Sequence, residues 1–133
     1  MDKIIVNDII KKLENKFPKN LKEDWDNVGL LVGENNLKVD KIQLSLDLNK
    51  KVIQNAIDRE VNMIITHHPF IFKGIKTVTN QTRLGKNIIK LIKNDIAVYT
   101  LHTNLDSAKD GLNDYIVTKL GVKQSEYLIK NEV

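Results

Sequence analysis

The sequence predicts an α/β fold, a layered domain with a mostly parallel or mixed sheet flanked by helices. From residue 41 onward, segments with strand-like and helix-like apolar patterns alternate three times. Two of the strand-like segments, 61–66 and 96–101, are almost continuously apolar, as in strands that are buried on both faces. The connections are short, and no repeat or Pro/Gly-rich linker interrupts them, so we predict a single domain over residues 1–133.

The part before this alternation predicts one helix and one short strand. Asn7 is placed to cap a helix over residues 8–17, whose apolar residues recur at helical spacing until Pro18 ends it. A polar loop that contains Trp25-Asp26-Asn27 leads into the apolar run 28–32. From the residues alone, this tryptophan is interpreted as a core aromatic residue, and the two residues after it as a turn.

At the start of the alternating part, residues 41–46 predict a strand, because apolar and polar residues alternate there. Its alternate apolar residues share one face: Ile42, Leu44 and Leu46. Asn49 is placed to cap a helix that ends near residue 60.

The C-terminal part predicts two further helices. The first covers residues 82–94 and precedes the second buried strand. The last helix starts at Ser107 or Asp110 and ends at a Gly121 C-cap. After it, residues 125–130 predict a strand.

Composition narrows the possible function classes. The chain has no cysteine, which excludes disulfides, thiolate metal sites and cysteine catalysis. No apolar run approaches the roughly 18 residues needed to span a bilayer, and the N-terminus lacks the pattern of a signal peptide. We therefore expect a cytoplasmic protein with no membrane partner.

The net charge of +4 does not predict nucleic acid as the primary partner. Only Arg59 and Arg83 are arginines among the 21 basic residues, and the lysines lie among acids on predicted helices, where a solvated face explains them. The glycines lack the spacing of a phosphate-binding loop, so the sequence does not identify a substrate.

All three histidines directly follow the two predicted buried strands. His67 and His68 come after the first and His102 after the second, with Asp106 four residues further on. Ligands of such sheets gather beyond the carboxyl ends of the strands, where Asp47 also lies. Imidazole and carboxylate groups together bind zinc, manganese, iron or nickel. The pattern therefore predicts a metal site at this rim of the sheet.

The adjacent histidines have a geometric consequence. On a regular strand, His67 and His68 would point to opposite faces and could not easily share one ion. At a strand end they can serve two neighbouring ions, with Asp106 as a bridging carboxylate. The residues alone also allow structural interpretations: His102 as a polar rim residue, and Asp47 and Asp106 as caps of the turns or helices that follow them.

Four motifs carry a resemblance to a known family. In chain order they are residues 25–33 (WDNVGLLVG), 46–47 (LD), 65–72 (ITHHPFIF) and 99–106 (YTLHTNLD). With this order and spacing, the chain resembles the N-terminal half of the dinuclear metal-centre proteins named GTP cyclohydrolase 1 type 2 homologs. The resemblance covers essentially all 133 residues.

The resemblance implies a cofactor and roles for the site residues. Two divalent metal ions would occupy each complete site, bound by the residues that match His67 and His68 and bridged or bound by the one that matches Asp106. His102 matches a residue that lines the site, and we expect it to ligate, orient or transfer a proton as a catalytic group. The family also implies a two-domain architecture, a homohexamer and a hydrolase or cyclohydrolase acting on a nucleotide-like substrate.

The chain departs from the family pattern after Asp106. Family members continue for at least another domain, whose histidine and glutamate complete the metal site. Here His102 is the last histidine, and Glu126 and Glu132 match no motif. We therefore expect an N-terminal half, whose missing ligands come from water, from other chains of an oligomer, or from a C-terminal half on a second chain.

Three function hypotheses follow. The first is a metal-dependent hydrolase or its N-terminal half, with activated water as the nucleophile. The second is a non-catalytic metal-binding or scaffold subunit. The third is an interaction module that has lost its metal site.

Overall fold

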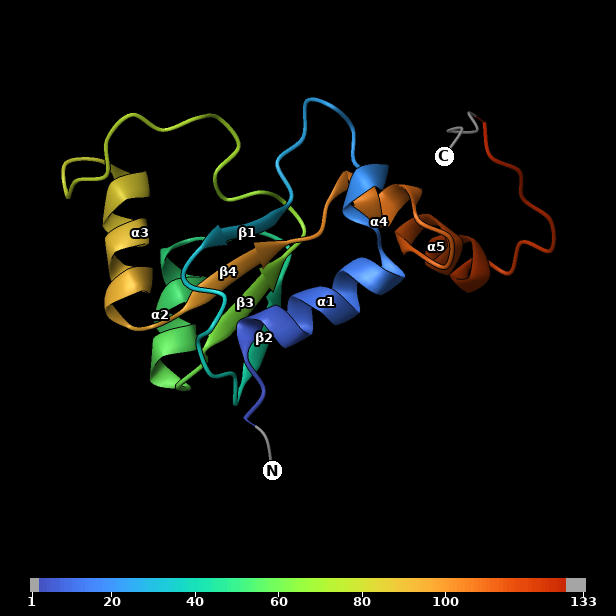
Figure 1. Cartoon of the computed structure of the whole chain (residues 1–133). Helices are drawn as coiled ribbons and strands as arrows, with labels where there is room; N and C mark the ends of the chain where they lie inside the picture. The colour runs from blue at the N-terminus through green and yellow to red at the C-terminus, as the bar shows by residue number, and fades with distance from the viewer. Residues whose placement is uncertain (1–2, 129–133) are drawn as a thin grey trace.

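The structure, a computed structural model, describes residues 3–128 and consists of a four-stranded mixed sheet between two layers of helices (Figure 1). The strands are β1 (Gly29–Val32), β2 (Ile42–Ser45), β3 (Met63–Thr66) and β4 (Ala97–Thr100). Their order across the sheet is β1-β4-β3-β2. Strands β2, β3 and β4 are parallel, and β1 pairs antiparallel with β4. The predicted α/β class with a mostly parallel or mixed sheet is confirmed.

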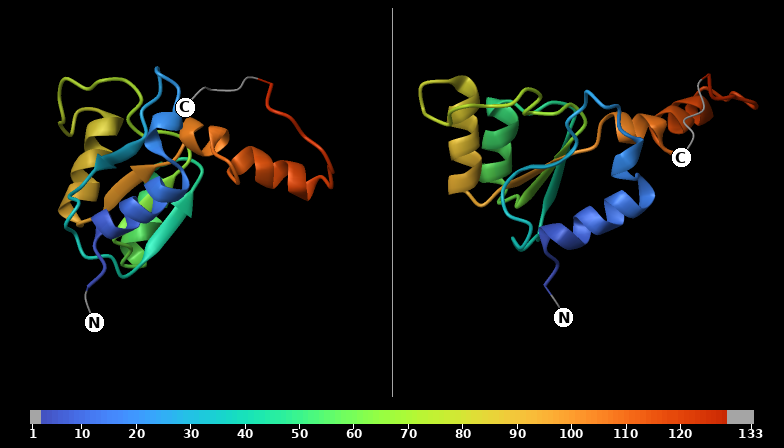
Figure 2. Two further views of the ribbon diagram at one scale, coloured as in Figure 1. Left: turned by 45° about the vertical axis from the view of Figure 1, so that its right-hand side comes forward. Right: turned by 45° about the horizontal axis from the view of Figure 1, so that its top comes forward.

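The helices lie on both faces of this sheet and beyond one end of it (Figures 1 and 2). They are α1 (Val6–Lys16), the 3-10 turn η1 (Lys19–Leu21), α2 (Lys50–Asp58), α3 (Arg83–Lys93), α4 (Thr103–Ser107) and α5 (Leu112–Lys119). Helices α2 and α3 stand side by side on one face, and α1 crosses the other. Helices α4 and α5 continue the chain outward from the end of β4.

The alternation of side chains along the strands produces two apolar cores, one on each face of the sheet. Ile64 and Val98 point to the face covered by α2 and α3, where they pack with Ile53 and Leu91. The neighbouring strand residues point to the face covered by α1: Met63, Ala97 and Tyr99. Because β3 and β4 are covered on both faces, their nearly continuous apolar sequences are explained.

The buried hydroxyl of Tyr99 donates a hydrogen bond to Glu14 Oε1 at 3.0 Å, which links β4 to α1. Burial and the neighbouring Glu14 carboxylate raise the pKa of this phenol above its ordinary value of 10.0. The tyrosine therefore remains neutral and a hydrogen-bond donor throughout the physiological pH range.

The predicted apolar face of β2 exists but is not covered. Ile42, Leu44 and Leu46 are 43%, 76% and 60% exposed. Strand β2 is an edge of the sheet, and α1 packs over the central strands rather than over this edge.

Two local predictions were wrong. Asn7 does not cap α1, because the helix begins one residue earlier and the Asp8 carboxylate accepts a hydrogen bond from the Ile5 N–H at 3.0 Å. The last predicted helix corresponds to α5, which begins at Leu112 and is followed by Gly121 with a positive φ of 71°, whereas the short helix α4 before it was not predicted. Of the strand predicted over 125–130, residues 125–128 form no strand, and Ile129 and Lys130 lie outside the described residues.

No helix within residues 3–128 has both the length and the apolar character needed to cross a membrane.

Candidate metal centre

The parallel pairing of β3 and β4 brings the two histidine-bearing segments to one edge of the sheet. Thr66 pairs with Thr100 at the last position of both strands, and their buried hydroxyls share a hydrogen bond at 2.8 Å. His67 follows directly after Thr66, and His102 follows two residues after Thr100. The two threonines, interpreted from sequence as ordinary strand residues, therefore fix the spacing of the segments that carry the site.

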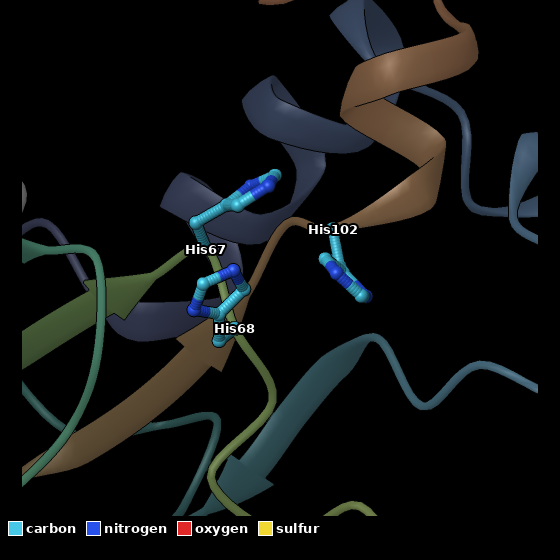
Figure 3. Close-up of side chains that lie close together, drawn as sticks. All are labelled: His67, His68 and His102. Atoms are coloured by element: carbon cyan, nitrogen blue, oxygen red, sulfur yellow. The ribbon is translucent and has the colours of Figure 1, made fainter.

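His67, His68 and His102 gather at this edge and are called the histidine cluster below (Figure 3). One potential ligand nitrogen from each residue lies within 4.8 Å of those of the other two. The ring centroids of His67 and His68 are 5.2 Å apart, and that of His102 lies 5.0 Å and 5.7 Å from them. The chain leaves the regular strand geometry at Thr66, so the two adjacent histidines are not directed to opposite faces as they would be inside a strand.

Each histidine is held by a hydrogen bond at Nδ1. His67 Nδ1 lies 2.9 Å from the backbone oxygen of Leu101, and His68 Nδ1 lies 2.7 Å from Asp47 Oδ1. His102 Nδ1 lies 2.9 Å from Asp26 Oδ1. A carbonyl or a carboxylate oxygen can only accept, so all three Nδ1 atoms carry the proton and donate it. In the neutral ring, this leaves the lone pair of each Nε2 available to a ligand.

Asp26 is the most deeply buried carboxylate of the site. Its side chain is 0% exposed and accepts hydrogen bonds from His102 Nδ1, from the N–H and hydroxyl of Thr103, and from the Asn27 N–H. Burial by itself would raise the pKa of Asp26, but the hydrogen bonds from these three residues outweigh it and hold the pKa below the ordinary value of 3.8. The carboxylate is therefore ionised and orients His102.

Asp106 lies at the border of the histidine cluster, within the short helix α4. Its Oδ1 atom is 3.7 Å from His67 Nε2, which is an ion-pair distance and longer than a hydrogen bond. The sequence allowed Asp106 to be a cap of a following element. It lies instead inside a helix whose first turn starts directly after His102.

The sequence predicted most of the residues that gather at this rim of the sheet. The structure places all four predicted site residues, His67, His68, His102 and Asp106, at one rim, and Asp47 joins them through His68. The sequence did not reveal the role of Asp26, because a buried carboxylate 76 residues before its histidine leaves no local spacing signal. The one available indication was the motif at residues 25–33, which contains Asp26.

An exposed aromatic pair borders the histidine cluster. Trp25 is 60% exposed, so its interpretation as a core residue was wrong. Its ring centroid lies 6.2 Å from that of His102 and 6.2 Å from that of Phe72, with edge-to-face geometry in both pairs. Asn27 Nδ2 donates to the Ile71 carbonyl at 2.6 Å, which ties the two loops that carry these aromatic rings.

The donor set suits a first-row divalent ion. Imidazole nitrogens with a nearby carboxylate are ligands for zinc, iron, manganese and nickel. Hydrogen bonds from the non-ligating nitrogen to a carboxylate or a carbonyl are the usual outer support of metal-binding histidines. Zinc–nitrogen bonds of about 2.0–2.1 Å hold two nitrogens of one ion at most about 4.2 Å apart, so nitrogens that lie within 4.8 Å of one another are near the spacing that metal binding needs.

Comparison with known proteins identifies relatives along nearly the whole chain. The family model described as Duf34/NIF3 (NGG1p interacting factor 3) matches residues 4–132. A protein of Clostridium acetobutylicum named GTP cyclohydrolase 1 type 2 homolog is 52% identical over 126 residues, which are 95% of this chain and 47% of the relative. A protein of the same name from Clostridium perfringens is 47% identical over 96% of this chain and 49% of the relative. The chain thus spans about half the length of these curated relatives.

Solved structures give the same result. The crystal structure of a Bacillus cereus protein related to NIF3 superposes with a TM-score of 0.91 at 38% sequence identity. The match covers 99% of this chain and 36% of that protein. The reduced form of HcgD from Methanocaldococcus jannaschii matches with a TM-score of 0.88 at 32% identity, over 97% of this chain and 52% of that one.

Proposed function

Because this chain belongs to the Duf34/NIF3 family, we propose that it binds divalent metal ions through its histidine cluster and Asp106, as part of a metal-dependent hydrolase site. The observation that carries the proposal is the common orientation of the three imidazoles. Each donates from Nδ1 to an oxygen of the protein, so each keeps Nε2 for a ligand. Three histidines oriented in this way within 4.8 Å are difficult to explain as ordinary polar rim residues.

The complete site takes two ions. His67 and His68 would hold one ion each, and Asp106, which lies next to His67, would be a ligand that the two ions share. A site of this kind needs more ligands than this chain supplies, and we propose that a C-terminal half or neighbouring chains of a homohexamer provide them. The share of the curated relatives that this chain matches, 47% and 49%, supports a partner segment of comparable length.

A divalent ion at this position would supply Lewis-acid chemistry for hydrolysis. The protein's own contribution is the placement of His102, whose Nδ1 is fixed by the buried, ionised Asp26. This leaves His102 Nε2 to ligate or to carry a proton, as in other histidine–carboxylate pairs. The relatives' printed name supports a nucleotide-like substrate for this chemistry.

The experiment is metal analysis after loading. The protein is loaded separately with Zn²⁺, Mn²⁺, Fe²⁺ and Ni²⁺, desalted, and its metal content is measured by elemental analysis. We expect His67→Ala and His68→Ala each to lose about one ion, and Asp106→Ala to weaken both. Asp24 is an exposed carboxylate two residues before Asp26, so Asp24→Ala is the control and should keep the wild-type content. Equal metal content in all variants, or no metal in the wild type, would refute the proposal.

Hydrolysis is tested separately from metal binding. The metal-loaded protein is assayed against nucleotide and phosphoester panels, together with His102→Ala. If the protein binds metal normally but hydrolyses none of these compounds, the hydrolase part of the proposal is refuted. The protein would then be a metal-binding or scaffold subunit.

A further inference from the structure

A basic groove lies beside the histidine cluster, between the N-terminal ends of α2 and α3. Its volume is about 1140 Å³. The residues that line it are Leu48, Asn49, Lys50, Lys51, Phe70, Arg83, Leu84, Lys86, Asn87 and Lys90. Five of these carry a positive charge and none carries a negative one. Among residues 3–128, none of the five takes part in a salt bridge, and Lys90 Nζ donates to a neutral partner, Gln54 Oε1, at 2.6 Å.

The helix ends reinforce this positive charge. Helices α2 and α3 have nine and eleven residues, and both direct their N-terminal ends, which carry a partial positive charge, toward the groove. Asn49 and Thr82 already accept hydrogen bonds from the first turns of these helices. The side chains of the groove, rather than free backbone N–H groups, are therefore the main donors to an anion.

Asn87 provides a second, independent observation. It is 7% exposed and lines the groove, yet its side-chain amide has no hydrogen-bond partner among residues 3–128. The amide is not among the fully buried side-chain atoms that lack a partner, so it remains accessible from the groove and is free to bond a ligand there. An amide N–H and several cations together suit a phosphate oxygen.

The groove adjoins the candidate metal centre through two chain segments. Leu48 follows Asp47 and Phe70 lies two residues after His68, and the Asp47 and His68 side chains are joined at 2.7 Å. A phosphorylated molecule in the groove would therefore extend its remaining part toward the histidine cluster. Ligands of α/β sheets bind at this position, outside the carboxyl ends of the strands.

We propose that this basic groove binds the phosphate groups of a small phosphorylated substrate and thereby positions it beside the histidine cluster. The proposal rests on the proposed function, which it deepens by assigning the substrate's chemical class. Sequence patterns could not identify this site, because it uses no glycine-rich loop and its cations come from two separate helices.

The test is calorimetric titration at low salt with three probes: sodium tripolyphosphate, GTP and guanosine. We expect tripolyphosphate and GTP to bind and guanosine to bind far more weakly, because the phosphates carry the affinity. GTP binding more tightly than tripolyphosphate identifies a nucleotide as the source of the phosphates, and equal affinity identifies phosphate chains in general. Guanosine binding as tightly as GTP, or no binding of tripolyphosphate at millimolar concentration, would overturn the proposal.

Two double variants, each of which removes two positive charges, are compared. Arg83→Gln/Lys86→Gln changes exposed groove residues, and Lys11→Gln/Lys12→Gln changes exposed residues on α1, across the sheet. We expect the groove double to weaken tripolyphosphate binding at least about tenfold, since a hydrogen bond to a charged group contributes that much, and the α1 double to leave it nearly unchanged. Equal losses in both doubles would show a general charge effect and overturn the proposal.

Asn87→Asp adds a second measurement, since a carboxylate at this position repels phosphate. Tripolyphosphate binding should be lost, while the thermal unfolding midpoint shows that the protein remains folded. If this variant unfolds, the Arg83→Gln/Lys86→Gln variant, which changes only exposed residues, still tests the proposal. Metal content of the groove double is measured in parallel. If this variant loses phosphate binding but keeps its metal content, the groove acts independently of metal binding. The proposed metal centre is tested separately by the histidine variants.

Discussion

Asp26 Oδ1 lies 2.9 Å from His102 Nδ1, although 76 residues separate the two in the chain. The carboxylate is completely buried and also accepts from Thr103, the first residue of α4. One side chain thus fixes both a histidine of the cluster and the start of the helix that carries Asp106. The geometry of the candidate site therefore depends on a residue that contributes no ligand atom to the histidine cluster.

Replacing Asp26 by asparagine should destabilise the fold. The variant keeps the size of the side chain but directs an N–H₂ group toward donors of Thr103 or His102, which leaves buried groups unpaired. We expect a loss of about 1–3 kcal/mol in the free energy of unfolding, measured by urea denaturation at pH 7. Asp24→Asn, an exposed neighbour, is the control and should change it by less than about 0.5 kcal/mol.

The pH dependence of this loss follows from the lowered pKa of Asp26. A carboxyl group whose folded pKa is depressed contributes stability above its unfolded pKa, near 3.8, and that contribution is lost as the pH falls through the folded value. The difference between wild type and Asp26→Asn should thus be constant at pH 5–7 and decrease below about pH 4. A difference that stays constant down to pH 2 would contradict the ionised state assigned to Asp26.

Trp25 should report metal loading by fluorescence. It is the only tryptophan of the sequence, and its ring centroid lies 6.2 Å from that of His102. A paramagnetic ion such as Ni²⁺ at the histidine cluster should quench its emission, whereas Zn²⁺, with a closed d shell, should change it little. The quenching should disappear in the His67→Ala/His68→Ala double variant. Quenching that persists in that variant would place the ion elsewhere.

A central strand and the edge strand of the sheet should differ sharply in their sensitivity to substitution. Ile64, on β3, is fully buried, so Ile64→Ala should cost about 2–5 kcal/mol of unfolding free energy. Leu44, on β2, is 76% exposed, and Leu44→Ala should change that free energy by less than about 0.5 kcal/mol. Guanidinium denaturation of both variants checks this. A large loss for Leu44→Ala would mean that another chain covers this face in solution.

The sequence was informative where local pattern and sheet geometry act together. Continuous apolar runs predicted β3 and β4, and the rule that parallel strands end at one edge was sufficient to bring His67 and His102 together. Asn49 was correctly predicted as a helix cap, because its carboxamide oxygen accepts from the N–H groups of Lys51 and Val52.

The features that the sequence did not reveal depend on tertiary contacts or on segments too short to leave a local pattern. The antiparallel placement of β1 beside β4 follows from long-range pairing, and the exposure of the apolar face of β2 depends on where α1 lies. Helix α4 was not predicted, because its five residues are too few to show a helical apolar pattern. Asp26 acts across 76 residues and was visible only through a motif.

Anomalous X-ray scattering from metal-loaded crystals tests the central claim most directly. Data are collected on both sides of the absorption edge of the loaded ion, for the wild type and for His67→Ala/His68→Ala. We predict anomalous peaks within bonding distance of the Nε2 atoms of the histidine cluster in the wild type, and no peak there in the variant. Peaks only at other positions, or bound through Nδ1 with the Asp26 and Asp47 contacts broken, would contradict the account.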